Sequence, residues 1–563
     1  MDIIYLEIYS LNDLCFAPIE TIVTLFVIKY CDSKIDIKLV KGKEESNEQA
    51  YTIDLSSFSY KLIDKEDILD HANTCKLPNI TVSKTNCIAG LCAILRQIIK
   101  GTLADHPNHH SRNLLGFKES CLIACSEASV WTKFCEVDII STLKYFKKDE
   151  KSNGELPPNI ARFECHMSQP VRLHNIYKYT TSKKFSGSFI MTDDGSNTIE
   201  HVYAEGPTIT LADLIIFVCL HNLLNMITIE NMDDLIPLTN RWYTRMINSP
   251  IIQDCLSILP EETECPGPSR FILPLVEQQS LYKSDTKRYK PKNRIYTRQE
   301  DVERSLNLAK KLEIESSSYE FPFGVEIDFN WSNIPFDATP TGGSLPLERL
   351  KRKHEQLENM CRPVIKLAKP GDVIVDFCSG VGHLGILIAY LLPECNVILL
   401  ENKEESLSRA KKRVKNLNLT NVKFCQCNLD YFKGKFQIGT SLHACGVATD
   451  LVIRQCIENN AVFVSSPCCY GSVQDVYHLT YPRSEIFRMN MSSRDYMILS
   501  HAADQTHDTQ NAKTEQGYLC MTIIDTDRKW HAEKFNYTVY LGNFIPPSCT
   551  PKNHILIGIP NRD

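Results

Sequence analysis

The C-terminal third of the chain alternates short apolar runs with amphipathic stretches, a pattern that predicts strands alternating with helices. The expected strands are 373–375, 396–400, 422–426, 437–442 and 461–465. The expected helices between them are 384–392, 403–416 and 451–458. Two further apolar runs, 537–544 and 554–559, predict a closing pair of strands. This alternation predicts a doubly wound parallel sheet.

The N-terminal half shows a different order of patterns. Its first hundred residues predict strands at 3–8, 35–40 and 76–82 and helices at 17–31 and 88–99. A helical region follows, in which Thr210 and Asp213 form a capping box before an apolar run. The expected domains are a small α/β domain (1–105), a helical domain (106–258), a linker (259–345) and a second α/β domain (346–563).

The first C-terminal strand leads into a glycine-rich turn that predicts a ligand site. Asp376 ends the strand, and Gly380 and Gly382 lie in the turn. Glycines here let backbone N–H groups approach a ligand at the start of the next helix. The second strand is followed by Glu401, and a carboxylate in this place can accept hydrogen bonds from a ribose diol. The sequence therefore predicts a nucleoside-binding site.

An acid followed by this glycine turn resembles motif I of the class I S-adenosylmethionine (SAM) methyltransferases, where the turn passes beneath a cofactor that has no phosphates. The resemblance implies a Rossmann-like domain with a seven-stranded sheet, and SAM as the cofactor. The cofactor contacts that it implies are Asp376, Cys378, Gly380, Gly382, Glu401, Asn402, Asn428 and Leu429.

Two loops after the fourth and fifth strands carry the candidate catalytic residues. They are His443, Asp450, Cys468 and Tyr470, accompanied by Cys445 and Cys469. In the interpretation we adopt, His443, Asp450 or Tyr470 orients or deprotonates an acceptor oxygen or nitrogen, and no metal is required. Three alternatives stay open: a thiolate of Cys468 or Cys445 that adds to a pyrimidine, a zinc site made by His443 and the three cysteines, and cysteines that merely fill the core.

The segment His443–Asp450, followed by the Cys468-Cys469 pair, resembles elements of the tRNA ribose 2′-O-methyltransferases that act on the acceptor stem. This resemblance implies RNA, either tRNA or rRNA, as the substrate. The segment Lys283–Arg298 carries seven Lys or Arg against one acid, with tyrosines interleaved. Such a segment suits contact with RNA, although a solvated linker has the same composition.

The front half resembles glutathione transferases, with Pro78 at the cis-proline position of their thioredoxin-like domain. Ser10 and Cys15 are the candidates for activating a glutathione thiol, but residues 89–92 lack the acid and hydroxyl that would hold the γ-glutamyl group. We therefore expect a degenerate domain that docks a protein partner. With this front half and the motifs above, the chain resembles the glutathione S-transferase C-terminal domain-containing protein family. We expect it to be an invertebrate member.

Composition adds limits on location and partners. The net charge of −6 gives no chain-wide reason to bind a polyanion, so we expect no DNA partner and only local RNA contact. No apolar run is long enough for a membrane span and no signal peptide follows Met1, so we expect a cytoplasmic protein with reduced cysteines. The expected function is a SAM-dependent methyltransferase that acts on RNA. The alternatives are a non-catalytic scaffold and a glutathione transferase.

Overall fold

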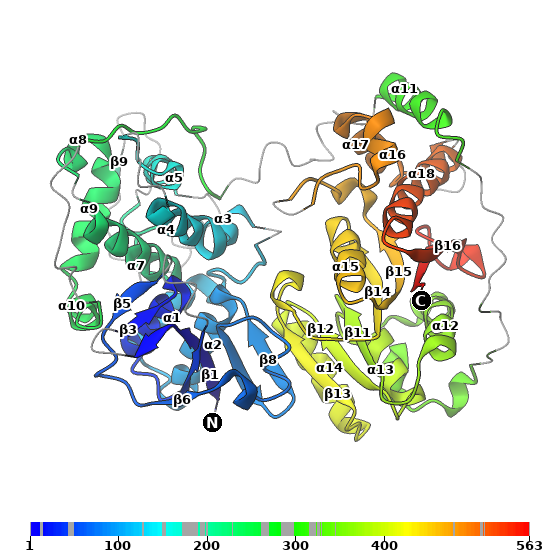
Figure 1. Ribbon diagram of the computed structural model, residues 1–563, viewed down its shortest axis with the longest axis horizontal. Helices are drawn as coiled ribbons and strands as arrows, with labels where there is room; N and C mark the ends of the chain where they lie inside the picture. The colour runs from blue at the N-terminus through cyan, green and yellow to red at the C-terminus, as the bar shows by residue number, and fades with distance from the viewer. Residues whose placement is uncertain are drawn as a thin grey trace. The chain divides into compact units, whose positions relative to one another are not determined.

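The structure is a computed structural model of the whole chain, and it divides into two compact units, Met1–Asp285 and Thr286–Asp563 (Figure 1). The residues that it describes are 2–11, 15–42, 50–126, 129–148, 154–171, 190–191, 197–198, 201–227, 229–259, 270–282, 298–314, 323, 327, 329–343, 345–476, 479–506, 511 and 513–561. The basic segment 283–298 lies outside these residues except for Arg298. Each unit is described by itself.

The second unit is built around a sheet with the strand order β16-β17-β15-β14-β11-β12-β13. The strands are β11 (Val373–Phe377), β12 (Asn396–Leu400), β13 (Val422–Gln426), β14 (Ile438–Cys445), β15 (Val462–Cys468), β16 (Tyr537–Asn543) and β17 (His554–Pro560). Strands β11 to β15 are parallel, whereas β17 is antiparallel to both β15 and β16. The doubly wound parallel sheet with an antiparallel closing pair is confirmed.

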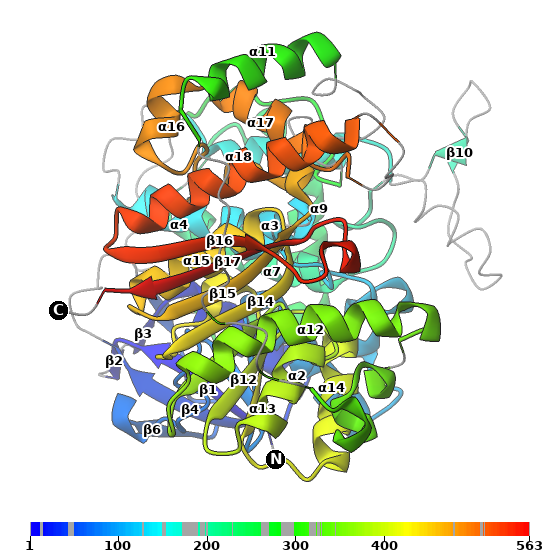
Figure 2. The same ribbon diagram turned by 90° about the vertical axis from the view of Figure 1, so that its right-hand side faces the viewer.

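Helices follow three strands of this sheet as the sequence pattern predicts: α13 (His383–Leu391), α14 (Glu404–Asn416) and α15 (Val447–Glu458). A further helix, α12 (Leu347–Leu367), precedes β11. The apolar faces of α12, α13 and α14 share one core with the strands, and Figure 2 shows α12 and α13 in front of the sheet. Because β11 to β15 are parallel, their carboxyl ends, where the candidate residues lie, are at one edge of the sheet.

The sequence pattern did not predict several helices of the second unit. They are α11 (Gln299–Lys310), α16 (Glu485–Asn490), α17 (Ser493–Ala502) and α18 (Lys513–Glu533). Helix α11 packs on α17, where Arg304 lies 3.0 Å from the carboxylate of Asp495. Part of the segment expected to be a linker therefore belongs to the compact second unit.

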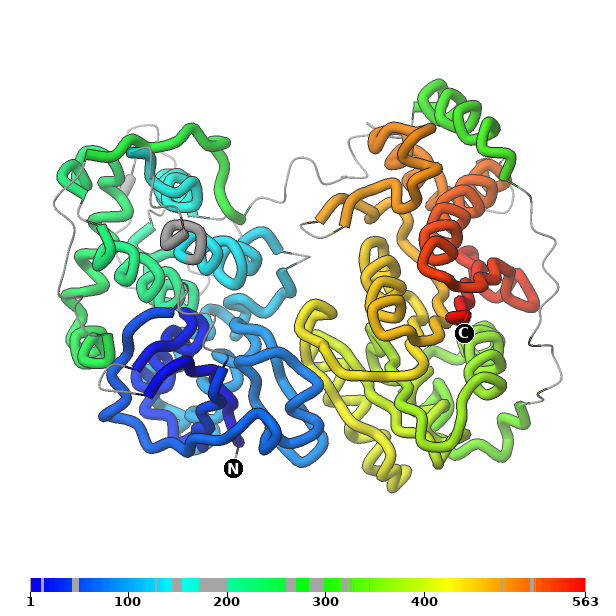
Figure 3. Tube along the Cα trace, in the orientation of Figure 1, coloured from blue at the N-terminus to red at the C-terminus, as the bar shows by residue number. Residues whose placement is uncertain are grey.

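The first unit begins with a mixed sheet of strand order β8-β7-β1-β4-β6. Figure 3 traces the chain of this part in blue. Its elements are β1 (Ile3–Ile8), α1 (Ile19–Tyr30), β4 (Asp36–Lys41), β6 (Tyr60–Ile63), β7 (Asn79–Ser83), β8 (Asn86–Ala89) and α2 (Leu91–Asp105). Strand β1 is parallel to β4 and antiparallel to β7, and the Leu77-Pro78 bond is cis, as in thioredoxin-like domains. The helix expected at 88–99 starts later, because Ile88 belongs to β8.

A small sheet and a helical region complete the first unit. The small sheet contains β2 (Ser10–Leu11), β3 (Cys15–Ala17) and β5 (Tyr51–Ile53), and a separate pair is β9 (Ile190–Met191) and β10 (Asn197–Thr198). The helices are α3 (Val130–Lys133), α4 (Ile139–Lys148), α5 (Pro158–Ser168), α7 (Leu211–Met226), α8 (Met232–Leu235), α9 (Pro237–Ile247) and α10 (Pro250–Leu256). One apolar core runs through the α/β and helical parts.

The predicted capping box at the start of α7 is present and does more than cap the helix. The backbone N–H of Thr210 donates to Asp213 Oδ2 at 2.8 Å. The other carboxylate oxygen accepts hydrogen bonds from the indole of Trp242 at 2.9 Å and from the N–H of Ala204 at 2.6 Å. Asp213 therefore joins α7, α9 and the preceding loop at a fully buried position.

Within the described parts of the chain, no helix is both long and apolar enough to cross a bilayer. The cysteines of these parts are free thiols.

Candidate functional site

The glycine turn after β11 faces the acid that follows β12. Glu401 Oε2 accepts a hydrogen bond from the N–H of Gly380 at 2.8 Å, and Oε1 accepts one from the N–H of Lys403 at 2.9 Å. The Glu401 side chain is mostly buried, so its carboxylate is held in one orientation. The acid expected to bind a ribose therefore points toward the turn expected to pass beneath the cofactor.

The turn leaves open space at one glycine and is tightly packed at two others. A Cβ atom added to Gly380, whose φ is +57°, would meet no atom within 4 Å. Gly382 and Gly385 have no such space, because a Cβ would lie 3.1 Å and 2.2 Å from the methyl groups of Leu399. The buried Ser379 hydroxyl has no hydrogen-bond partner among the described residues. The turn thus offers a cradle at Gly380 and close helix–strand packing behind it.

Asp376 lies at the inner end of this turn and is almost completely buried. Its Oδ2 accepts a hydrogen bond from the N–H of Gly385 at 2.9 Å, which connects β11 to α13. Burial raises the pKa of Asp376 to about 7, although the Gly385 hydrogen bond and the nearby Lys353 oppose that shift. A cation bound at the turn would favour the ionised form of this carboxyl group.

Three of the predicted cofactor residues lie after β12 and β13. Asn402 Nδ2 donates to Asn428 Oδ1 at 3.3 Å, so the two amide side chains that we predicted to bind the cofactor lie together. Leu429 is buried in a short 3-10 helix that begins there. Cys378 lies in the glycine turn itself with a φ of +55°. The structure therefore places the predicted cofactor residues along one edge of the sheet, and their contacts with a cofactor stay a prediction.

His443 lies at a bulge in β14 and is exposed to solvent. Its φ of +73° is unusual for a residue other than glycine, and the register of β14 with β15 shifts at this point. The ring Nε2 lies 3.3 Å from Gln356 Oε1. Although part of its surface is exposed, the ring lies among enough protein atoms to be desolvated. This desolvation, and then the nearby Lys353, lower the pKa of His443 to about 4, so the ring is neutral at pH 7. A neutral, exposed imidazole is able to accept a proton or a hydrogen bond.

Lys353 is a site residue that the sequence analysis did not single out. It projects from α12, and its Nζ lies 3.4 Å from the same Gln356 oxygen. Desolvation lowers the pKa of Lys353 to about 8, while the charge of Asp376 opposes this shift. A sequence signal existed: Lys353 falls three residues after Leu350 and four before Leu357, on the apolar stripe of the helix.

Asp450 and Tyr470, which we predicted to be catalytic, instead belong to a buried ion-pair network. Arg528 on α18 contacts Asp450 at 2.8 Å and Asp525 at 2.8 Å, and the Tyr470 hydroxyl donates to Asp525 at 2.6 Å. Asp450 also accepts a hydrogen bond from the Tyr481 hydroxyl at 2.8 Å. Because these groups are buried and hydrogen-bonded to the protein, they have a structural role and we leave them out of the candidate site.

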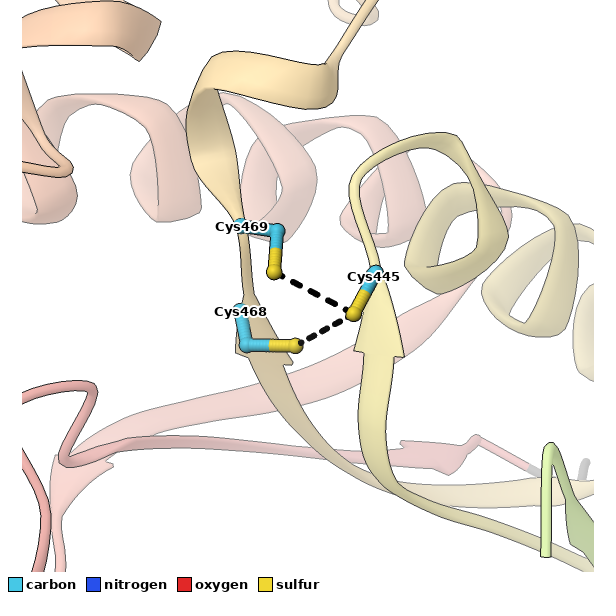
Figure 4. Close-up of side chains that lie close together, drawn as sticks. All are labelled: Cys445, Cys468 and Cys469. Carbon is cyan, nitrogen blue, oxygen red and sulfur yellow. Dashed lines mark hydrogen bonds between the residues drawn. The ribbon is translucent and has the colours of Figure 1, made fainter. Parts of the chain in front are cut away.

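The fourth predicted catalytic residue, Cys468, lies in a cluster of three thiols (Figure 4). The Sγ atoms of Cys468 and Cys445 lie 3.2 Å apart, and the Sγ atoms of Cys445 and Cys469 also lie 3.2 Å apart. Hydrogen bonds with the other two thiols, and then the charge of Lys552, lower the pKa of Cys469 to about 3. The two loops expected to meet at the catalytic edge do meet, and they bring sulfur atoms together.

The first unit shows no comparable arrangement at its candidate thiol. Burial and the nearby Asp54 raise the pKa of Cys15, which opposes formation of a thiolate. Ser10 lies in β2, next to β3, which contains Cys15. Residues 89–92, where a glutathione site would need an acid and a hydroxyl, are Ala-Gly-Leu-Cys and are buried. These observations do not favour glutathione activation.

Comparison with known proteins defines the class first. A family model described as a methyltransferase domain matches residues 351–476, which span α12 to the loop after β15. The strand order and the glycine turn agree with this match. The second unit therefore contains a methyltransferase domain.

Relatives over the full length then define the family. The chain is 40% identical to the glutathione S-transferase C-terminal domain-containing protein homolog of Drosophila pseudoobscura pseudoobscura, and the alignment covers 99% of each chain. It is 33% identical to the corresponding Homo sapiens protein, with 99% of this chain and 98% of that protein covered. The chain therefore belongs to the glutathione S-transferase C-terminal domain-containing protein family.

Solved structures similar to part of the chain include methyltransferases. A putative SAM-dependent methyltransferase from Methanococcus maripaludis is 14% identical and covers 42% of this chain and 98% of its own, with a TM-score of 0.25. A putative rRNA-methylase from Clostridium thermocellum is 14% identical and covers 36% and 92%, with a TM-score of 0.22. Similarities at this TM-score carry no argument about function.

Proposed function

We propose that this protein is a SAM-dependent methyltransferase whose acceptor is RNA. The observation that carries the proposal is the pairing of Glu401 with the Gly380 N–H beside open space. A carboxylate fixed beside a glycine cradle suits the ribose of a nucleoside. When bound, SAM supplies an activated methyl group.

The chemistry that remains for the protein is to align the acceptor and to take up its proton. His443 and Lys353 are suited to this task because they flank Gln356 at the carboxyl edge of the sheet. With pKa values lowered to about 4 and about 8, the imidazole is neutral and the amine partly neutral near pH 8. Either group is therefore able to accept a proton from a hydroxyl or amino group as the methyl is transferred.

RNA is the acceptor class that the sequence favours. The segment His443–Asp450 and the Cys-Cys pair resemble elements of RNA ribose methyltransferases, and residues 283–298 supply local positive charge with aromatic rings. The thioredoxin-like and helical parts of the first unit would then dock a protein partner. Cytoplasmic location remains part of this proposal.

Mass spectrometry of modified nucleosides tests the proposal most directly. Total tRNA and rRNA from cells without the protein should lack a methylated nucleoside that the wild-type chain restores and Glu401→Gln does not restore. A matched control is Glu405→Gln, which alters an exposed carboxylate on α14 that pairs with Arg409. If no methylated nucleoside differs between the two cell lines, RNA methylation is wrong.

A non-catalytic scaffold is the second candidate, and cofactor binding separates it from the enzyme. Calorimetric titration with SAM should show micromolar binding to the full chain if the site is used. Absence of binding to a correctly folded protein would favour the scaffold. A glutathione transferase is the third candidate, and retention of the protein on immobilised glutathione would support it.

A further inference from the structure

The thiols of Cys445, Cys468 and Cys469 all lie within 4.8 Å of one another. Elsewhere in the described residues, no other group of three or more His, Cys, Asp or Glu side chains meets this distance. Cys445 is the last residue of β14, Cys468 is the last residue of β15, and the two are register partners in the parallel sheet. The pair therefore points to the same face of the sheet, at the edge where parallel strands end.

The third thiol joins the cluster because of an unusual backbone conformation. Successive side chains of an extended strand point in opposite directions, so a Cys-Cys pair in a strand would separate its sulfur atoms. Cys469 instead has φ 50° and ψ 50°, in the left-handed region. For a residue other than glycine this conformation costs on the order of 1–2 kcal/mol. It turns the Cys469 sulfur back toward Cys445 (Figure 4).

Backbone contacts outside the thiols hold the two loops in this arrangement. The N–H of Gly446 donates to the carbonyl of Cys468 at 3.0 Å, and a Cβ at Gly446 would lie 2.8 Å from the backbone of Ser472. Asp504 accepts hydrogen bonds from the N–H groups of residues 470–471 at 3.1 Å and 2.8 Å. The sulfur atoms are thus brought together by a frame that does not depend on their own contacts, as expected of a preorganised ligand site.

We propose that Cys445, Cys468 and Cys469 bind one zinc ion at the carboxyl edge of the methyltransferase sheet. Thiolate sulfur is a preferred zinc ligand, and tetrahedral bonds of about 2.3 Å place sulfur atoms about 3.8 Å apart. The two observed distances of 3.2 Å need to widen only slightly to reach that value. A zinc ion here replaces the expectation of a site without metal, and it does not depend on methyl transfer.

The fourth zinc ligand would come from solvent or from a bound molecule. Cys468 is buried and Cys469 half-buried, but Cys445 is exposed, so the cluster opens on one side. The neighbouring side chains are engaged elsewhere: His443 contacts Gln356, and Asp504 contacts Lys552 at 3.1 Å. Three protein ligands with one open position are typical of zinc ions that take part in binding or chemistry. An exposed Cys445 also argues against thiols that simply fill a core.

Metal analysis of the full-length protein tests the site without any assay of activity. Protein expressed with added zinc and desalted should contain about one zinc ion per chain by plasma mass spectrometry. Cys445→Ser, Cys468→Ser and Cys469→Ser should each lose most of that zinc. Cobalt(II) added to metal-free protein should produce sulfur-to-cobalt charge-transfer absorption, which the same variants lack.

Cys15→Ser provides the matched control, because Cys15 is a half-buried thiol in the other unit. It should keep its full metal content. Because Cys445 is exposed, Cys445→Ser should fold and melt like the metal-free wild type, so its loss of zinc would not reflect unfolding. Unchanged zinc content in all three variants would overturn the proposal. A disulfide between two of the three cysteines in the protein as first purified, without any removal of metal, would overturn it too.

Discussion

Replacing Glu401 by glutamine tests the nucleoside site at its most constrained group. The wild-type carboxylate accepts hydrogen bonds from the N–H groups of Gly380 and Lys403 at 2.8 Å and 2.9 Å. Each oxygen keeps further lone pairs, which a ribose diol can use. Glutamine preserves the shape of the side chain but replaces one acceptor oxygen by an NH2 donor and removes the charge. The variant therefore changes hydrogen bonding with little change in packing.

The expected loss of affinity follows from the strength of hydrogen bonds to a carboxylate. A hydrogen bond to a charged group contributes about 1.5–3 kcal/mol, and leaving a donor without an acceptor adds a cost of similar size. Because glutamine retains one acceptor oxygen, we expect a loss of about 2–3 kcal/mol, which is a 30- to 150-fold rise in the Kd for SAM.

Calorimetry with SAM, and with S-adenosylhomocysteine as the product, measures this change. Glu405→Gln is the control, because Glu405 is an exposed carboxylate whose partner is Arg409 on the same helix. It should bind SAM as the wild type does. A thermal melt without SAM checks that Glu401→Gln is folded. If the folded variant binds SAM within about threefold of the wild type, a difference of less than about 0.7 kcal/mol, the carboxylate does not hold the ribose.

Three further predictions concern single residues of the second unit. Gly380→Ala should destabilise the fold by only about 1–2 kcal/mol, because φ is +57° but no atom lies near the new methyl, and should abolish SAM binding in calorimetry. Arg528→Ala should cost about 3–5 kcal/mol in urea unfolding, because Asp450 would stay buried without its partner, whereas the exposed Arg454→Ala should cost under about 1 kcal/mol. The pKa of Asp376 rises from 3.8 to about 7 on folding, so the protonated carboxyl group contributes on the order of 4 kcal/mol to stability. This contribution is full below pH 4 and is lost as the pH rises through 7. In urea unfolding, Asp376→Asn should therefore reduce the change in the free energy of unfolding over this pH range.

The fold of the methyltransferase sheet could be predicted because its strands are buried on both faces. Residues 396–400 and 422–426 were placed at their observed bounds, since continuous apolar runs between turn residues leave little ambiguity. Helix α18 shows the opposite case. It buries Asp525, Asp527 and Arg528, so its apolar periodicity is broken by charged residues that pair only in the folded chain. No pattern of hydrophobic positions reveals such a helix.

In the candidate site too, the sequence predicts the roles that follow from local order and misses those that depend on distant partners. Asp376, Gly380 and Glu401 could be found because their roles follow from local order: a strand end, a tight turn and the next strand end. Asp450 also follows a strand, yet its partner Arg528 is 78 residues away on α18. The role of a carboxylate after a strand therefore depends on what reaches it in three dimensions. Lys353 has a local signal, its position on the apolar stripe of α12, but only the packing of α12 shows that its amine lies near Asp376.

We expect that the matched methyltransferase segment, residues 351–476, does not fold stably by itself. Residues 351–476 contain Lys353, the glycine turn, Glu401 and the three thiols. They do not contain Arg528, whose guanidinium neutralises Asp450 in a site from which water is excluded. A fragment that ends at residue 476 would also lack β17, so β15 would lose its antiparallel partner and the core would lose Phe544, Ile555 and Ile557. The edge of the sheet that carries the candidate chemistry is therefore held in place by a helix outside the matched segment.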